Sequence, residues 1–177
     1  MPLKPDVLKK YKNRCFVETG TYLGEGVVAA LQAGFTIIRS VELDPNLAAI
    51  NRGRFAPHPD VQIHAGDSGA LLGGIIRDIN EPITFWLDAH NSSAELLEEG
   101  KNCPLLRELE QIKNHPINTH TILIDDIRCC GTPHFDTITK DDLLNILHEI
   151  NPEYEISYED SADPRFKQDV LVAQIRD

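Results

Sequence analysis

The sequence predicts an α/β fold, in which a mostly parallel sheet of seven strands lies between two layers of helices. Short apolar runs fit for buried strands alternate along the chain with segments of helical apolar spacing, which is typical of parallel strands joined by helices. The last two runs alternate apolar and polar residues and flank the turn-rich segment 160–164. We therefore expect them to form an antiparallel hairpin at the sheet edge.

The expected elements follow one another in chain order. The strands span Cys15–Val17, Thr36–Val41, Val61–His64, Ile83–Leu87, Thr121–Ile124, Tyr154–Tyr158 and Asp169–Ile175. The helices between them span Gly26–Ala33, Pro45–Phe55, Ser68–Ile79, Ser93–His115 and Lys140–Ile150, and their apolar sides should face the sheet. Segment 129–138 is expected to be a loop, and Thr139 or the first residues after it supply the start signal of the last helix.

Length and charge limit the possible classes of protein. A chain of 177 residues fits a single domain, 1–177, with a continuous core. Its 17 basic and 28 acidic residues give a net charge of −11, which would repel a nucleic-acid backbone, so we expect no nucleic-acid partner.

The sequence also indicates a cellular compartment and the state of the cysteines. No apolar run approaches the roughly 18 residues that span a bilayer, and the first five residues contain no apolar signal core, so we expect a cytoplasmic protein with no membrane partner. The four cysteines are interpreted as reduced thiols. A metal or redox role for the adjacent pair Cys129 and Cys130 remains an alternative.

The segment 16–26 joins the first strand to the first long helix and carries an acid and three glycines. Gly20, Gly24 and Gly26 allow a sharp turn and a close approach of a ligand to the backbone. Glu18 stands two residues before the first of them, where a carboxylate would repel a pyrophosphate and suit an ammonium group. The alternative is that these glycines serve only helix–strand packing.

A second acid follows the next expected strand. Glu42 ends that strand, where a carboxylate can accept hydrogen bonds from both hydroxyls of a ribose. Asp44 precedes Pro45 and is interpreted as a helix cap. The glycine order G-x-x-x-G-x-G differs from the dinucleotide pattern G-x-G-x-x-G, which favours a different nucleoside-like ligand.

With these residues in place, the chain from about Arg14 onward resembles the class I methyltransferases that use S-adenosylmethionine, which have a Rossmann-like three-layer sandwich ending in a reversed hairpin. The resemblance implies that the glycine segment holds the methionine end of the cofactor, that Glu42 holds the ribose, and that residues after the third strand meet the adenine. The cofactor-binding candidates are Glu18, Thr19, Gly20, Thr21, Gly24, Gly26, Glu42, Leu43, Asp67, Ser68 and Asp88. Asp67 and Ser68 could instead only cap the following helix.

Three aspartates form a second group at strand ends. Asp88 follows the fourth expected strand, and Asp125 and Asp126 follow the fifth. If these strands are neighbours, the three carboxylates converge, and either one takes up a proton or a cation lies among them. Oxygen ligands of this kind suit Mg²⁺. The alternative is that they accept hydrogen bonds in turns or pair with Arg128 and Lys101.

This second group is similar to that of metal-dependent O-methyltransferases of the catechol and macrocin types. That similarity implies that Asp88, Asp125 and Asp126 bind Mg²⁺, which draws a substrate hydroxyl towards the sulfonium methyl. Catechol-type enzymes carry a lysine base three residues after the first metal acid, where this chain has Asn91. His90 is the local substitute as base, so His90 and Asp88 are the catalytic candidates.

The sequence therefore predicts Mg-assisted methyl transfer from S-adenosylmethionine to a hydroxyl of a small molecule, of sugar or natural-product type. Two alternatives remain: a non-catalytic module that binds S-adenosylmethionine or a nucleotide, and an enzyme that binds a nicotinamide dinucleotide. Few residues precede the first strand, so a partner in a homodimer, or the loops after Asp88 and Asp126, would close the substrate site.

Overall fold

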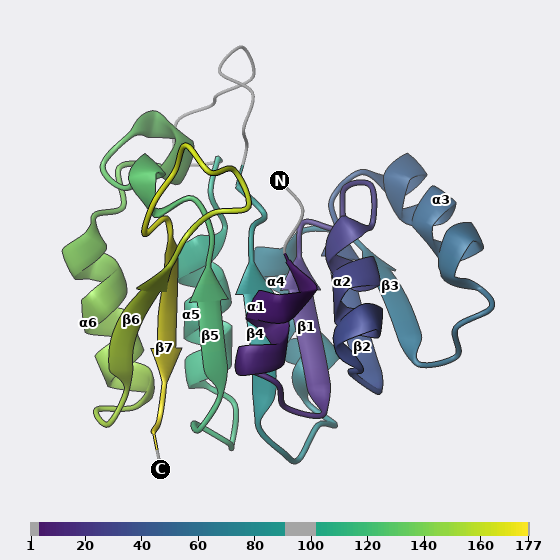
Figure 1. Cartoon of the computed structure of the whole chain (residues 1–177), viewed down its shortest axis with the longest axis horizontal. Helices are drawn as coiled ribbons and strands as arrows, with labels where there is room; N and C mark the ends of the chain where they lie inside the picture. Colours follow the sequence, from purple (N-terminus) through teal and green to yellow (C-terminus); the bar gives the residue numbers. More distant parts are fainter. Residues whose placement is uncertain (1–3, 91–101, 177) are drawn as a thin grey trace.

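The computed structural model describes residues 4–90 and 102–176, and one seven-stranded sheet organises them (Figure 1). The strand order is β3-β2-β1-β4-β5-β7-β6. The strands are β1 (Cys15–Thr19), β2 (Ile37–Glu42), β3 (Val61–Ala65), β4 (Ile83–Leu87), β5 (Thr121–Ile124), β6 (Glu155–Glu159) and β7 (Val170–Gln174). The first five pair in parallel, whereas β7 pairs antiparallel with both β5 and β6. The predicted fold class is confirmed.

Helices cover both faces of the sheet. They are α1 (Pro5–Lys10), α2 (Glu25–Ala33), α3 (Pro45–Phe55), α4 (Ser68–Ile76), α5 (Leu105–Lys113) and α6 (Lys140–Ile150). Alternate residues of each strand face opposite layers, as the pleat requires. Phe85 of β4 packs in one core with α4, α5 and α6, and its neighbour Trp86 packs in the other core with α1, α2 and α3. The result is a three-layer sandwich.

Two helices are shorter than the sequence predicts. The long helix expected over Ser93–His115 is wrong as a continuous element, because residues 102–104 are not helical and α5 begins at Leu105. Pro104 explains this start, since a proline disfavours helical conformation at the residue before it. Residues 93–101 lie outside the described part of the chain. The helix expected to reach Ile79 ends at Ile76, whose carbonyl accepts a turn hydrogen bond from the Ile79 N–H.

The carboxyl ends of the five parallel strands lie along one edge of the sheet, the upper edge in Figure 1. In an open α/β sheet this edge is where ligands bind. Among the described helices, none is long and apolar enough to cross a bilayer. All four cysteines are free thiols.

Candidate functional site

Glu18 lies near the carboxyl end of β1 and is almost completely buried, with 2% of its surface exposed. The Ser40 hydroxyl of β2 donates a hydrogen bond of 2.6 Å to Glu18 Oε2, and the Ser40 and Thr21 hydroxyl oxygens are 2.6 Å apart. Burial and, to a smaller degree, the charge of Glu42 raise the pKa of Glu18 to about 8, although the Ser40 hydrogen bond lowers it. At neutral pH Glu18 therefore holds a proton, and a positive charge placed beside it would favour its ionised form.

The three glycines of the segment face protein atoms. A Cβ on Gly26 would stand 1.7 Å from Glu18 Oε1, and a Cβ on Gly20 would stand 2.4 Å from the carbonyl oxygen of Asp88. Gly24 has φ +78°, and a Cβ there would stand 2.5 Å from Asn51 Oδ1. Each position thus has a packing reason to be glycine. That they also allow a ligand to approach the backbone closely stays a prediction.

Glu42 organises the loops on either side of it. Its Oε2 accepts a hydrogen bond of 2.7 Å from the Tyr22 N–H, and its Oε1 accepts one of 2.9 Å from the Asp44 N–H. Each carboxylate oxygen has a second lone pair, so the group retains acceptor capacity for ribose hydroxyls. Leu43, the next residue, is 72% exposed and offers an apolar surface beside this carboxylate. Asp44 caps α3 through hydrogen bonds from the N–H groups at its start, as expected.

The adenine candidates Asp67 and Ser68 both take part in local structure. Asp67 caps α4 and forms an ion pair of 2.6 Å with Arg107 of α5. The Ser68 hydroxyl donates to Glu108, a completely buried carboxyl whose pKa is raised to about 7 by burial, although hydrogen bonds from Ser68 and Thr19 lower it. The capping alternative is therefore present, and contact with adenine stays a prediction. The sequence did not single out Glu108, because its partners come from distant elements.

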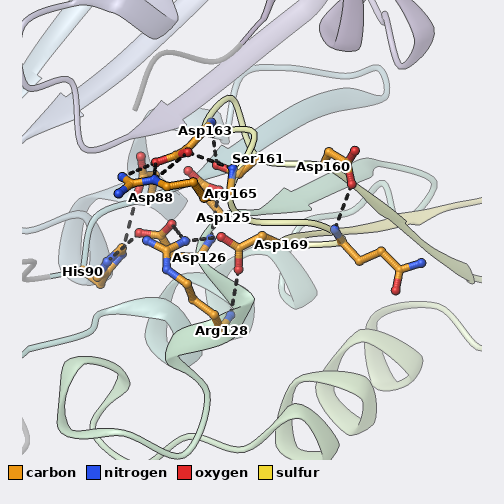
Figure 2. Close-up of polar contacts among 11 residues, drawn as sticks. Asp88, His90, Asp125, Asp126, Arg128, Asp160, Ser161, Asp163, Arg165 and Asp169 are labelled. Atoms are coloured by element: carbon orange, nitrogen blue, oxygen red, sulfur yellow. Dashed lines mark hydrogen bonds and ion pairs between the residues drawn. The ribbon is translucent and has the colours of Figure 1, made fainter.

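The structure brings the three predicted metal ligands together (Figure 2). Asp88 follows β4 and Asp125 and Asp126 follow β5, its neighbour in the sheet. One carboxylate oxygen from each lies within 4.8 Å of the others. Burial and the neighbouring charges raise the pKa of Asp88 well above its usual range and that of Asp125 to about 6. Carboxylate oxygens are the ligand type that Mg²⁺ prefers, so these three residues could hold this ion.

His90 lies between two of these carboxylates. Its Nδ1 is 3.5 Å from Asp88 Oδ1, and its Nε2 is 3.1 Å from Asp126 Oδ2. The side chain is only 6% exposed, and the edge of its ring meets Phe135 with centroids 5.1 Å apart. The predicted base therefore belongs to the carboxylate cluster. Asn91, which stands where catechol-type enzymes have a lysine, lies outside the described residues.

Arg128 supplies a positive charge to the same cluster. Its guanidinium binds Asp126 Oδ1 and Asp169 Oδ2. The same guanidinium lies over the ring of Phe166, with Cζ 4.0 Å from the ring centroid. The predicted alternative of pairing between the aspartates and Arg128 thus holds for Asp126, whereas Lys101 lies outside the described residues. The sequence did not single out Asp169, although an acid at the start of the last strand, beside the end of β5, could have been considered.

Known proteins resemble this chain in structure rather than in sequence. The sequence matches no protein-family model and no curated protein. Similar solved structures include TomG, an O-methyltransferase from Streptomyces achromogenes involved in tomaymycin synthesis and determined with SAM. It has 13% identity and a TM-score of 0.62 over 98% of this chain and 78% of its own. An O-methyltransferase from Bacillus cereus with SAH has 14% identity and a TM-score of 0.61 over 97% and 78%.

A third similar structure has a different chemistry. The glycopeptide N-methyltransferase MtfA, determined with sinefungin, has 12% identity and a TM-score of 0.58 over 97% of this chain and 85% of its own. At these identities the likeness concerns the fold. The chain has the Rossmann-like fold of these methyltransferases, including the antiparallel β5-β7-β6 ending.

Proposed function

We propose that this chain transfers a methyl group from S-adenosylmethionine to a hydroxyl of a small molecule, of sugar or natural-product type, with the assistance of Mg²⁺. One observation carries the proposal: the glycine segment and the carboxylate cluster are in direct contact. The Cα of Gly20 lies against the backbone of Asp88, whose N–H donates to the Thr19 carbonyl at 3.2 Å. A ligand on the glycine segment would therefore lie next to the carboxylates.

The cofactor-binding part of the proposal depends on two acids. Glu42, with its remaining acceptor capacity, would hold the ribose hydroxyls, and Leu43 would contact the adenine. Glu18 would ionise in response to the ammonium group, because its burial leaves it protonated otherwise. S-adenosylmethionine supplies an electrophilic methyl group bound to a sulfonium sulfur. As the acceptor oxygen forms a bond to the methyl carbon, the carbon–sulfur bond breaks and the cofactor leaves as a neutral thioether.

The acceptor part depends on the carboxylate cluster. Asp88, Asp125 and Asp126 would hold Mg²⁺, which supplies Lewis acidity towards a hydroxyl. His90 would accept the hydroxyl proton, and Asp88 would stabilise the resulting imidazolium through its contact with Nδ1. The O-methyltransferases among the similar structures support a hydroxyl acceptor, whereas MtfA shows that the same fold also serves nitrogen.

Calorimetric titration with S-adenosylhomocysteine, with and without Mg²⁺, tests both parts. We expect micromolar binding of the nucleoside, and a separate Mg²⁺ titration that the Asp125→Asn variant weakens at least ten-fold. A methyl-transfer assay on a panel of hydroxyl compounds then tests catalysis. No binding of S-adenosylhomocysteine would contradict the proposal; binding without transfer to any acceptor would favour the non-catalytic module.

A further inference from the structure

A second set of metal-binding atoms overlaps the carboxylate cluster. His90, Asp126 and Cys129 each offer one ligand atom, and these atoms all lie within 4.8 Å of one another. The set differs in chemistry from the three aspartates, because it combines an imidazole nitrogen, a carboxylate oxygen and a cysteine sulfur.

The turn after β5 brings Cys129 to this position. Asp126 has φ 58°, a left-handed conformation that ends the strand abruptly. A short 3-10 helix, η2 (Ile127–Cys129), follows, and the Cys129 N–H donates to the Asp126 carbonyl at 2.7 Å. The chain thus folds back on itself, and residues three apart share one side of the turn.

We propose that His90, Asp126 and Cys129 bind a divalent transition metal of the zinc class. Three protein ligands of mixed nitrogen, oxygen and sulfur type, with a fourth position left to water, are typical of zinc sites with an open position. Thiolate and imidazole ligands both suit zinc, whereas Mg²⁺ prefers oxygen ligands and retained water. The three aspartates and this mixed set therefore prefer different ions although they share Asp126.

The groups around His90 support the assignment independently. If Nε2 binds the metal, the opposite ring nitrogen, Nδ1, faces Asp88 Oδ1 at 3.5 Å. A carboxylate that orients the second nitrogen is the usual outer partner of a metal-bound histidine. Arg128 binds Oδ1 of Asp126, whereas Oδ2 faces His90, so the arginine fixes the carboxylate without covering the oxygen on the histidine side.

Occupancy of the mixed site has a consequence that rests on the proposed function. Asp126 is also a proposed Mg²⁺ ligand and His90 the proposed base, so a zinc-class ion would remove both from the methyl-transfer reaction. Zinc would then inhibit methyl transfer, and Mg²⁺ would relieve the inhibition only in large excess.

Titration of the metal-free protein with Co²⁺ tests the site without any assay of activity. Cobalt bound by a thiolate gives a charge-transfer absorption band in the near ultraviolet. We expect this band in the wild type, in Cys130→Ser and in Asp125→Asn, and its loss in Cys129→Ser. Cys130 is the matched control because it is the adjacent thiol and does not belong to the mixed set.

Zinc and magnesium affinities complete the test. Cys129→Ser should lower zinc affinity at least ten-fold and leave magnesium affinity within two-fold, with an unchanged circular dichroism spectrum. A wild type without the cobalt band, or a band that persists in Cys129→Ser, would overturn the proposal. Neither result bears on the binding of S-adenosylhomocysteine, which is measured without transition metals, so the two proposals fail separately.

Discussion

The Cα of Gly26, in the first turn of α2, lies directly over the carboxylate of Glu18 in β1: a Cβ at Gly26 would stand 1.7 Å from Oε1. The helix approaches the strand this closely only because Gly26 has no side chain. The same contact buries Glu18, which shifts its pKa. The packing of the glycine segment and the protonation of its acid therefore have one structural cause.

The first prediction concerns this contact. Gly26→Ala should lower the free energy of unfolding by about 1–3 kcal/mol, because the new methyl group displaces the carboxylate and overpacks the site. In a Glu18→Ala background the same substitution should leave the free energy of unfolding nearly unchanged, since the carboxylate that the new methyl group would overlap is absent. Urea denaturation of the four proteins of this double-mutant cycle gives the coupling. Additive effects would show that the two residues do not exclude each other.

The second prediction concerns pH. The pKa of Glu18 is raised in the folded state, from 4.5 to about 8, so the folded state binds more protons than the unfolded state between these values. The contribution of Glu18 to stability is thus fully present below pH 4.5 and is lost as pH rises through 8, at most at about 1.4 kcal/mol per pH unit.

Glu18→Gln measures that loss. The variant should become more stable relative to the wild type as pH rises from 6 to 8.5, by chemical denaturation at each pH. Glu25→Gln, at an exposed acid in the first turn of α2, is the control and should keep the wild-type dependence. Parallel stability curves for the wild type and Glu18→Gln would contradict the raised pKa.

The third prediction concerns Arg128. Its guanidinium neutralises the buried Asp169 and stacks on Phe166, so Arg128→Met should lower the free energy of unfolding by about 2 kcal/mol, after allowance for its partial exposure. Arg165→Met removes a more exposed guanidinium that pairs with Asp163 and contacts the same ring at 5.5 Å. Arg165→Met should therefore destabilise the protein less than Arg128→Met in thermal unfolding. Equal losses of stability would contradict the stabilising role of the ion pair between Arg128 and Asp169.

The centre of the sheet was predictable because β4 and β5 are buried on both faces and are therefore continuous apolar runs. The predicted bounds of the fourth and fifth strands agree with β4 and β5, and from these the meeting of Asp88, Asp125 and Asp126 follows. The mixed metal-binding set was not predictable. The proximity of Cys129 to His90 depends on the left-handed conformation of Asp126. No pattern in the neighbouring sequence predicts that conformation.

The hydrogen-bond partners of the buried acids could not be predicted from the sequence either. Glu108 reads as one more acid on an amphipathic helix, yet it is buried against Ser68, forty residues earlier. Ser40 occupies an inward position of β2, and its role depends on the register that sets it beside Glu18. Such contacts depend on how helices and strands pack together, which periodicity does not specify.

The fourth prediction concerns the ribose contact. Glu42→Gln should weaken binding of S-adenosylhomocysteine at least ten-fold, because a neutral amide accepts hydroxyl hydrogen bonds less strongly than a carboxylate. Asp44→Asn is the matched control: it keeps the cap of α3 and should bind the nucleoside as the wild type does. Calorimetry measures both, and equal affinities for Glu42→Gln and the wild type would remove Glu42 from the cofactor site.

The most direct measurement is a crystal structure of the chain soaked with S-adenosylhomocysteine. The account predicts the nucleoside across the carboxyl ends of β1 and β2, with both ribose hydroxyls within hydrogen-bond distance of Glu42 and the sulfur directed towards Asp88. A nucleoside bound elsewhere, or an edge that stays empty at saturating concentration, would contradict it.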